Sequence, residues 1–122
     1  MSIVAPPRPY SLDERTELFA REVRALVKRL PRTLANSEDA RQVVRSSGSV
    51  GANYIEANEA LSKKDFAMRI KISRKEAKES GYWLRLVDAG PDESLAGECL
   101  RLNNEAGELV KIFAAILAKS GG

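Results

Sequence analysis

The sequence predicts an all-α fold, an antiparallel up-down four-helix bundle with short loops. Three observations support this prediction. Apolar residues recur at spacings of three and four in four successive segments, which is the period of one helix face. A capping or punctuation signal separates each segment from the next. The links between segments are short, so consecutive helices must run antiparallel as neighbours.

The first helix is expected to begin at a capping box in residues 11–14 and to stop at Pro31. Its apolar stripe comprises Leu12, Thr16, Phe19, Val23, Leu26 and Leu30. Asn36 or Ser37 is expected to cap the second helix, because acidic residues follow in its first turn. The second stripe comprises Ala40, Val43, Ser47, Val50, Tyr54, Ala57 and Leu61.

The motif SKKD at residues 62–65 is the start signal of the third helix, and the glycine and proline at 90–91 end that helix. Its stripe comprises Phe66, Ile70, Ser73, Ala77, Ser80, Leu84 and Val87. The fourth helix is expected to begin at Pro91 or Asp92. Its stripe comprises Leu95, Cys99, Leu102, Ala106, Leu109, Phe113 and Ile116.

Composition is that of a soluble globular chain. The 122 residues suffice for a single domain over 1–122, with 1–10 as a flexible N-terminal lead and 120–122 as a frayed tail. No apolar run approaches the 18 or so residues of a membrane span, and no signal peptide is visible. The one cysteine, Cys99, excludes an internal disulfide and fits a reducing cytoplasm. The net charge of +3 alone identifies no partner.

Two glycines, Gly48 and Gly51, interrupt the second helical pattern within RSSGSVGANYIEANEA, although glycine costs a helix interior about 0.5–1 kcal/mol. The inward positions around them are small, and so are the facing positions of the third helix. The first set is Ser47, Gly48, Gly51 and Ala52, and the second set is Ser73, Ala77, Ser80 and Gly81. Small residues on both sides predict close packing of the second and third helices.

Asn53 and Glu56 share a helical face near the boundary of the core. A partly buried carboxylate needs a partner, and Arg69 lies across the short turn. The spacing favours a structural network that holds the second and third helices in register, and a binding site is the alternative.

Basic residues are concentrated on the third helix. Residues 63–85 contain eight basic and three acidic side chains. The first helix adds Arg21, Arg24, Lys28, Arg29 and Arg32. Such a stripe suits phosphate backbones, and an ordinary solvated helix face is the alternative. The expected nucleic-acid contacts are Lys71, Arg74, Lys75, Lys78, Arg69 and Arg45. Few aromatic residues are available to stack bases, so sequence-specific readout is not expected.

The third helix also carries a second apolar stripe, rotated from the first. It comprises Met68, Ile72, Trp83 and Leu86. A helix in a single bundle needs only one apolar face, so this stripe predicts a subunit interface with tryptophan as its anchor. A wide core that absorbs the stripe is the alternative.

Catalysis is not expected. The chain has no histidine, which removes the Glu-x-x-His ligands of di-iron bundles and histidine-based triads. The acid pairs Glu76 with Glu79 and Glu105 with Glu108 are expected to be surface carboxylates rather than metal ligands. Cys99 lies on an apolar stripe and is expected to be an inert thiol. We therefore predict no cofactor, no metal and no catalytic residue.

Residues 45–88 carry a specific resemblance. The pattern Arg45, Ser49, Asn53 and Glu56 is similar to the motif of the bacterial four-helix-bundle family named after the 23S rRNA intervening-sequence protein. The third-helix segment of that family is matched by Asp65, Phe66, Ile72, Lys75, Glu76, Ala77, Trp83 and Leu84. One departure is visible, because Ala57 and Asn58 stand where many members have glycine.

The resemblance implies a compact bundle that assembles into a ring-like homopentamer. A related group looks like the accessory proteins of diversity-generating retroelements, whose basic outer surface engages nucleic acid and a reverse transcriptase. Two functions follow as expectations. The first is a non-catalytic oligomer that binds RNA, such as rRNA, or DNA through its basic face. The second is a protein–protein adaptor for a partner enzyme such as a reverse transcriptase, with no membrane involved in either.

Overall fold

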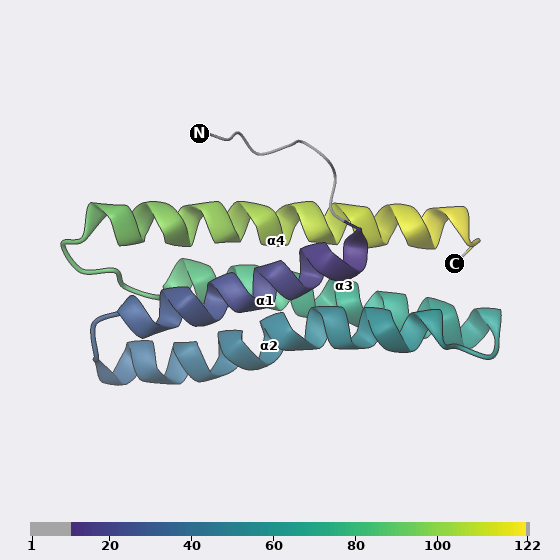
Figure 1. Cartoon of the computed structure of the whole chain (residues 1–122), viewed down its shortest axis with the longest axis horizontal. Helices are drawn as coiled ribbons and strands as arrows, with labels where there is room; N and C mark the ends of the chain where they lie inside the picture. The colour runs from purple at the N-terminus through teal and green to yellow at the C-terminus, as the bar shows by residue number, and fades with distance from the viewer. Residues whose placement is uncertain (1–10, 122) are drawn as a thin grey trace.

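The computed structural model describes residues 11–121 and confirms the four-helix bundle (Figure 1). The helices are α1 (Leu12–Arg29), α2 (Leu34–Asn58), α3 (Lys63–Leu86) and α4 (Glu93–Lys119). They run up and down in chain order, and within residues 11–121 there is no strand. The predicted lead at 1–10 and the last residue of the predicted tail lie outside the described residues. No helix in the described part of the chain is long and apolar enough to cross a membrane.

Three of the four predicted helix starts are confirmed by their caps. The Ser11 hydroxyl accepts the backbone N–H of Glu14 at 3.1 Å, and the Glu14 carboxylate accepts the N–H of Ser11 at 3.2 Å. Ser62 accepts the N–H of Asp65 at 3.0 Å at the start of α3. Asp92 does the same for α4. Each cap is local in sequence and therefore readable from it.

Two predicted boundaries are wrong. Thr33, not Asn36 or Ser37, caps α2, and its hydroxyl accepts the N–H of Asn36 at 3.1 Å. At the other end, α3 stops at Leu86, before the glycine and proline at 90–91. The chain is then extended at Val87, and the turn follows at Gly90, whose φ of +67° only glycine adopts readily.

The core is formed by the predicted stripes. Their buried members are centred on large side chains from α1 and α4, namely Phe19, Leu26, Leu102, Leu109 and Phe113. Leu61 is the main exception and is fully exposed, because α2 ends at Asn58 and the turn carries Leu61 outward. In α4 the stripe ends on Leu117, which is buried, rather than on Ile116, which is half-buried.

Helix α1 is the shortest element, with 18 residues against 24 to 27 in the other three. It packs against α2 and α4, and one end of the bundle extends beyond it (Figure 1). Ion pairs line its border with α4: Arg15–Glu105 at 2.7 Å, Arg101–Glu22 at 3.0 Å and Arg29–Asp92 at 3.6 Å. Three ion pairs thus join α1 to α4 or to its cap.

Candidate functional site

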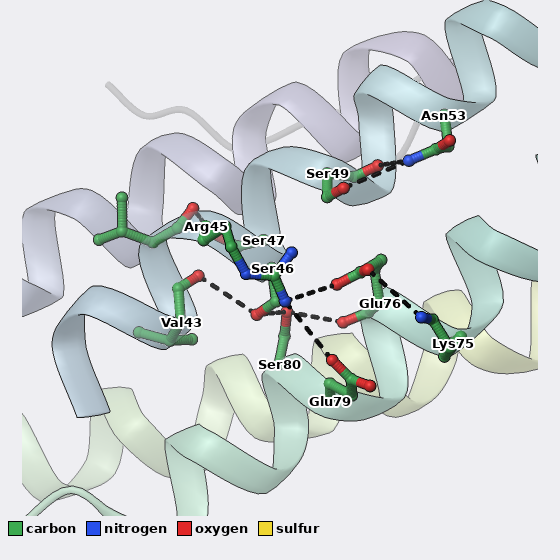
Figure 2. A network of polar contacts seen from close by, with 11 residues as sticks. Val43, Arg45, Ser46, Ser47, Ser49, Asn53, Lys75, Glu76, Glu79 and Ser80 are labelled. Atoms are coloured by element: carbon green, nitrogen blue, oxygen red, sulfur yellow. Dashed lines mark hydrogen bonds and ion pairs between the residues drawn. The ribbon is translucent and has the colours of Figure 1, made fainter. Parts of the chain in front are cut away.

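Buried hydroxyl groups join α2 to α3. Ser46 Oγ and Ser80 Oγ are 2.8 Å apart, and Ser80 Oγ donates to the backbone oxygen of Glu76 at 2.9 Å (Figure 2). Ser80 uses its proton there, whereas the other acceptor near Ser46, the Val43 oxygen, is 3.5 Å away, so Ser46 is assigned as the donor between the two hydroxyls. About two helical turns earlier on α3, Ser73 Oγ donates to the Val50 oxygen at 2.9 Å. All three serines are fully buried, so they let the two helices approach closely while satisfying every hydroxyl.

A charged pair lies at the edge of these serines. Glu76 is only 6% exposed, and its carboxylate accepts a hydrogen bond from Arg45 Nη2 at 3.2 Å (Figure 2). The same guanidinium is 3.5 Å from Glu79, and Lys75 Nζ is 3.9 Å from Glu76. A buried carboxylate is costly without such partners. Arg45 therefore serves as the counter-ion of Glu76.

The expected network around Asn53 is confirmed in part. Asn53 Oδ1 accepts from Arg69 Nη1 at 3.1 Å, and its Nδ2 donates to the backbone oxygen of Ser49 at 2.9 Å. The amide also reaches the Ser49 hydroxyl at 3.2 Å (Figure 2). Glu56 was expected beside Arg69, and here the prediction is wrong. Glu56 is exposed and forms no ion pair within residues 11–121, and Arg69 binds Asn53 instead.

The predicted partner of the two glycines is also wrong, although close packing is confirmed. A Cβ added to Gly51 would lie 2.9 Å from Thr16 Oγ1, and one added to Gly48 would lie 3.3 Å from Arg24 Nη2. Both glycines therefore face α1 rather than α3. The facing residue Gly81 lies against Asn103 of α4. Successive helix positions differ by 100°, so a stripe serving two neighbours is easily assigned to the wrong one.

The basic ridge is the set Lys71, Arg74, Lys75 and Lys78 on the outer side of α3. All four side chains are exposed. Among residues 11–121, Lys71, Arg74 and Lys78 form no ion pair within 4.0 Å, and Lys75 is only at the limit of that distance from Glu76. Arg45 and Arg69, by contrast, already hold Glu76 and Asn53. Three of the four ridge cations thus lie in no ion pair of the described chain.

The second apolar stripe of α3 is divided between surface and core. Met68 is 51% and Leu86 is 47% exposed, whereas Ile72 and Trp83 are half-buried. Trp83 packs against the core and meets Tyr82 edge-on at 5.0 Å between ring centroids. Its indole N–H is buried and finds no acceptor within residues 11–121. Only the two ends of the stripe are open to a partner.

The cysteine and the acidic side chains considered above as a nucleophile or as metal ligands have structural surroundings. Cys99 is buried, and burial raises the pKa of its thiol. Glu76 was expected to be a surface carboxylate, and this prediction is wrong, because Glu76 is buried against Arg45. Glu105 is half-buried and pairs with Arg15. Within residues 11–121, no three cysteine or acidic side chains gather closely enough to share a metal ion.

Sequence reasoning overlooked a groove between α3 and α4, which holds about 680 Å³ beside the ridge. Its basic residues are Lys78, Arg85 and Lys111. Arg85 and Lys111 were not proposed from the sequence, because only packing shows that the two helices place them around one hollow. The signal that the sequence offers for such a groove is the number of basic residues on each of the two helices.

The fold and these contacts define an up-down four-helix bundle in which buried hydroxyls and a buried ion pair join α2 to α3. The chain belongs to the 23S rRNA-intervening sequence protein family, whose model matches residues 12–92. This match confirms the resemblance found in residues 45–88.

A solved structure agrees with this assignment. The chain is similar to a protein of unknown function from the S23 ribosomal protein family of Bacteroides thetaiotaomicron, with 30% sequence identity and a TM-score of 0.71. The match covers 88% of this chain and 98% of that one. No curated protein gives a significant match.

Proposed function

We propose that this protein is a non-catalytic homo-oligomer that binds nucleic acid through the basic ridge of α3. One observation carries the proposal: Lys71, Arg74 and Lys78 are exposed and have no acidic partner within residues 11–121. Arg15, Arg45 and Arg101 are held in ion pairs with acids of neighbouring helices, whereas the three ridge cations are not. The family name refers to 23S rRNA, which makes RNA the first ligand to test.

The expected binding is electrostatic. Lysine and arginine contacts to phosphates release condensed counter-ions, so affinity falls steeply as salt rises. Phosphate contacts carry no base information, and unrelated sequences should bind about equally. A homo-oligomer, the pentamer that the resemblance implies, would repeat the ridge on every subunit and strengthen the field. The single cysteine supports a reducing cytoplasm as the compartment.

The test is a salt titration of binding to two unrelated RNAs and one duplex DNA. The ridge variant carries Lys71→Gln, Arg74→Gln and Lys78→Gln together, because Lys75 lies near Glu76. We expect weaker binding to every ligand and a shallower slope of log affinity against log salt. The control variant carries Arg24→Gln, Lys28→Gln and Arg32→Gln. It removes three positive charges, as the ridge variant does, but from α1 and the link that follows it. Helix α1 packs against α2 and α4 and not against α3, so these charges lie away from the ridge.

Two results would overturn the proposal. One is the absence of wild-type binding at low salt, and the other is an equal loss in the ridge and control variants. In the first case the adaptor function takes its place, supported by the half-exposed Met68 and Leu86 on the same helix. An adaptor for a partner enzyme such as a reverse transcriptase would be retained by that protein and not by nucleic acid.

A further inference from the structure

The groove between α3 and α4 has the lining of a phosphate-binding channel. Lys78 and Arg85 come from α3, and Asn103, Asn104 and Lys111 come from α4. Small residues line the bottom of the groove and leave it open. One of them is Gly107, where an added Cβ would meet nothing within 4 Å. Ammonium, guanidinium and amide groups are the donors that proteins direct at phosphate oxygens.

The charge of the groove is positive and largely free. Three cations face one acid, Glu108, which lies 3.5 Å from Lys111 Nζ. Arg85 uses Nη1 on the Asn103 side-chain oxygen at 3.1 Å, and its other donors remain available. Within residues 11–121, neither Lys78 nor Arg85 has an acidic partner. An anionic ligand would therefore enter without first displacing an ion pair at these two positions.

An exposed aromatic ring stands beside the groove, outside its lining. Tyr82 is 49% exposed and lies one helical turn from both Lys78 and Arg85 on α3. The chain has few aromatic residues for base stacking, but this one is surface-accessible and has a cation one turn away in each direction along α3. Aromatic rings among phosphate-binding cations are typical of single-strand binding surfaces.

The exposed ring selects the form of nucleic acid. In a duplex the bases are stacked on one another, whereas the bases of a single strand are free to stack on an aromatic side chain. A single strand that lies along the groove can therefore place a base on Tyr82 while its phosphates contact the cations.

We propose that the α3–α4 groove binds single-stranded nucleic acid, with phosphates on Lys78, Arg85 and Lys111 and a base stacked on Tyr82. The inference rests on the proposed function, which it deepens by naming the strand type and the path. The ridge and the groove meet at Lys78, which belongs to both.

Two glycines of α4 provide a matched test. Gly107 lines the groove, whereas Gly97 does not line it, and a Cβ at either would meet nothing within 4 Å. Gly107→Gln and Gly97→Gln both improve helix propensity and leave the charge unchanged. Only the first places a side chain in the groove. Both variants should be at least as heat-stable as wild type, so lost binding will not reflect unfolding.

The measurement is the affinity for a fluorescent single-stranded RNA, the matching single-stranded DNA and their duplexes. We expect Gly107→Gln to bind single strands about tenfold more weakly than Gly97→Gln, as when several phosphate contacts are lost. Tyr82→Leu should lose about fivefold or more, while Tyr82→Phe should bind like wild type because the ring is kept. Wild type should prefer single strands, and equal RNA and DNA affinities would place the recognition in the shared phosphate backbone.

Different failures have different meanings. If wild type binds no nucleic acid at low salt, the proposed function and this inference fall together. If it binds and the ridge variant weakens binding, but the two glycine variants bind alike, the function stands and the groove is rejected. Duplex binding as tight as single-strand binding would likewise reject the groove.

Discussion

Asn36 joins two loops that lie far apart in the sequence. Its side-chain amide donates to the backbone oxygens of Pro31 and Asp88, each at 2.9 Å. Its oxygen accepts the N–H of Asp88 at 2.9 Å. The link between α1 and α2 and the link between α3 and α4 are at the same end of the bundle (Figure 1). A single buried side chain thus satisfies three backbone groups and closes that end.

We predict that Asn36→Asp destabilises the protein by about 1–3 kcal/mol, the usual cost of leaving buried polar groups unsatisfied. Aspartate keeps the shape but places an acceptor against two carbonyl oxygens. Urea denaturation at neutral pH measures the loss. The control is Ser37→Asp at the exposed neighbouring position, where a carboxylate near the helix start is neutral or favourable. Equal stabilities of the two variants would contradict the bridging role.

At the scale of whole helices, two glycines of α2 face α1, namely Gly48 and Gly51, one turn apart. The two positions differ in what they face. Gly51 meets Thr16, which is buried and donates its hydroxyl to the Leu12 oxygen at 2.9 Å. Gly48 meets only the end of the exposed Arg24 side chain. One glycine is therefore required by packing, and the other has a neighbour that can move aside.

We predict opposite effects of the same substitution at these two sites. Gly51→Ala should lose about 1–3 kcal/mol by overpacking against Thr16. Gly48→Ala should gain up to about 1 kcal/mol from helix propensity. Thermal and urea denaturation give both values. Thr16→Ala should restore much of the loss when combined with Gly51→Ala, and a purely additive double variant would show that the two residues do not touch.

Caps and stripes were predictable from the sequence because they depend on neighbours within one or two turns. Ser11, Ser62 and Asp92 each cap a helix through a backbone group three residues away. Asn36 was misread as a cap because its partner Asp88 is 52 positions distant. Periodicity predicted that Gly51 is packed, but not which of two adjacent helices it meets.

The candidate site was predictable in its charges and not in its geometry. The sequence indicates that Lys71, Arg74 and Lys78 share a helix face, and the structure places them there. It does not indicate that Arg45 is occupied by Glu76, since the two lie 31 positions apart on different helices. The groove beside Lys78 needs both α3 and α4, and therefore depends on how the bundle closes.

For the whole molecule, the distribution of exposed apolar side chains bears on assembly. Met68 and Leu86 are about half exposed on the outer side of α3, whereas Trp83 between them packs on the core. A Trp83→Arg variant would therefore disturb folding as well as assembly. The two exposed ends of the stripe offer a cleaner test of the proposed homo-oligomer.

We predict that Met68→Glu with Leu86→Glu lowers the mass measured by light scattering while leaving the helical circular dichroism unchanged. Two charges in a desolvated interface are strongly unfavourable without partners. The matched control is Leu34→Glu, which replaces an even more exposed leucine (81%) at the start of α2. A wild-type protein that runs as a monomer at micromolar concentration would contradict oligomerisation.

The up-down order of the helices has a consequence for folding on the ribosome. Contacts between consecutive helices form soon after synthesis, but α1 also packs on α4, which is made last. At about 5–20 residues per second, α1 would wait roughly 5–20 s for that partner. The side that waits carries Arg15, Glu22 and Arg29, whose later ion pairs are with α4. These charges keep the unfinished edge of the nascent bundle hydrated until α4 docks.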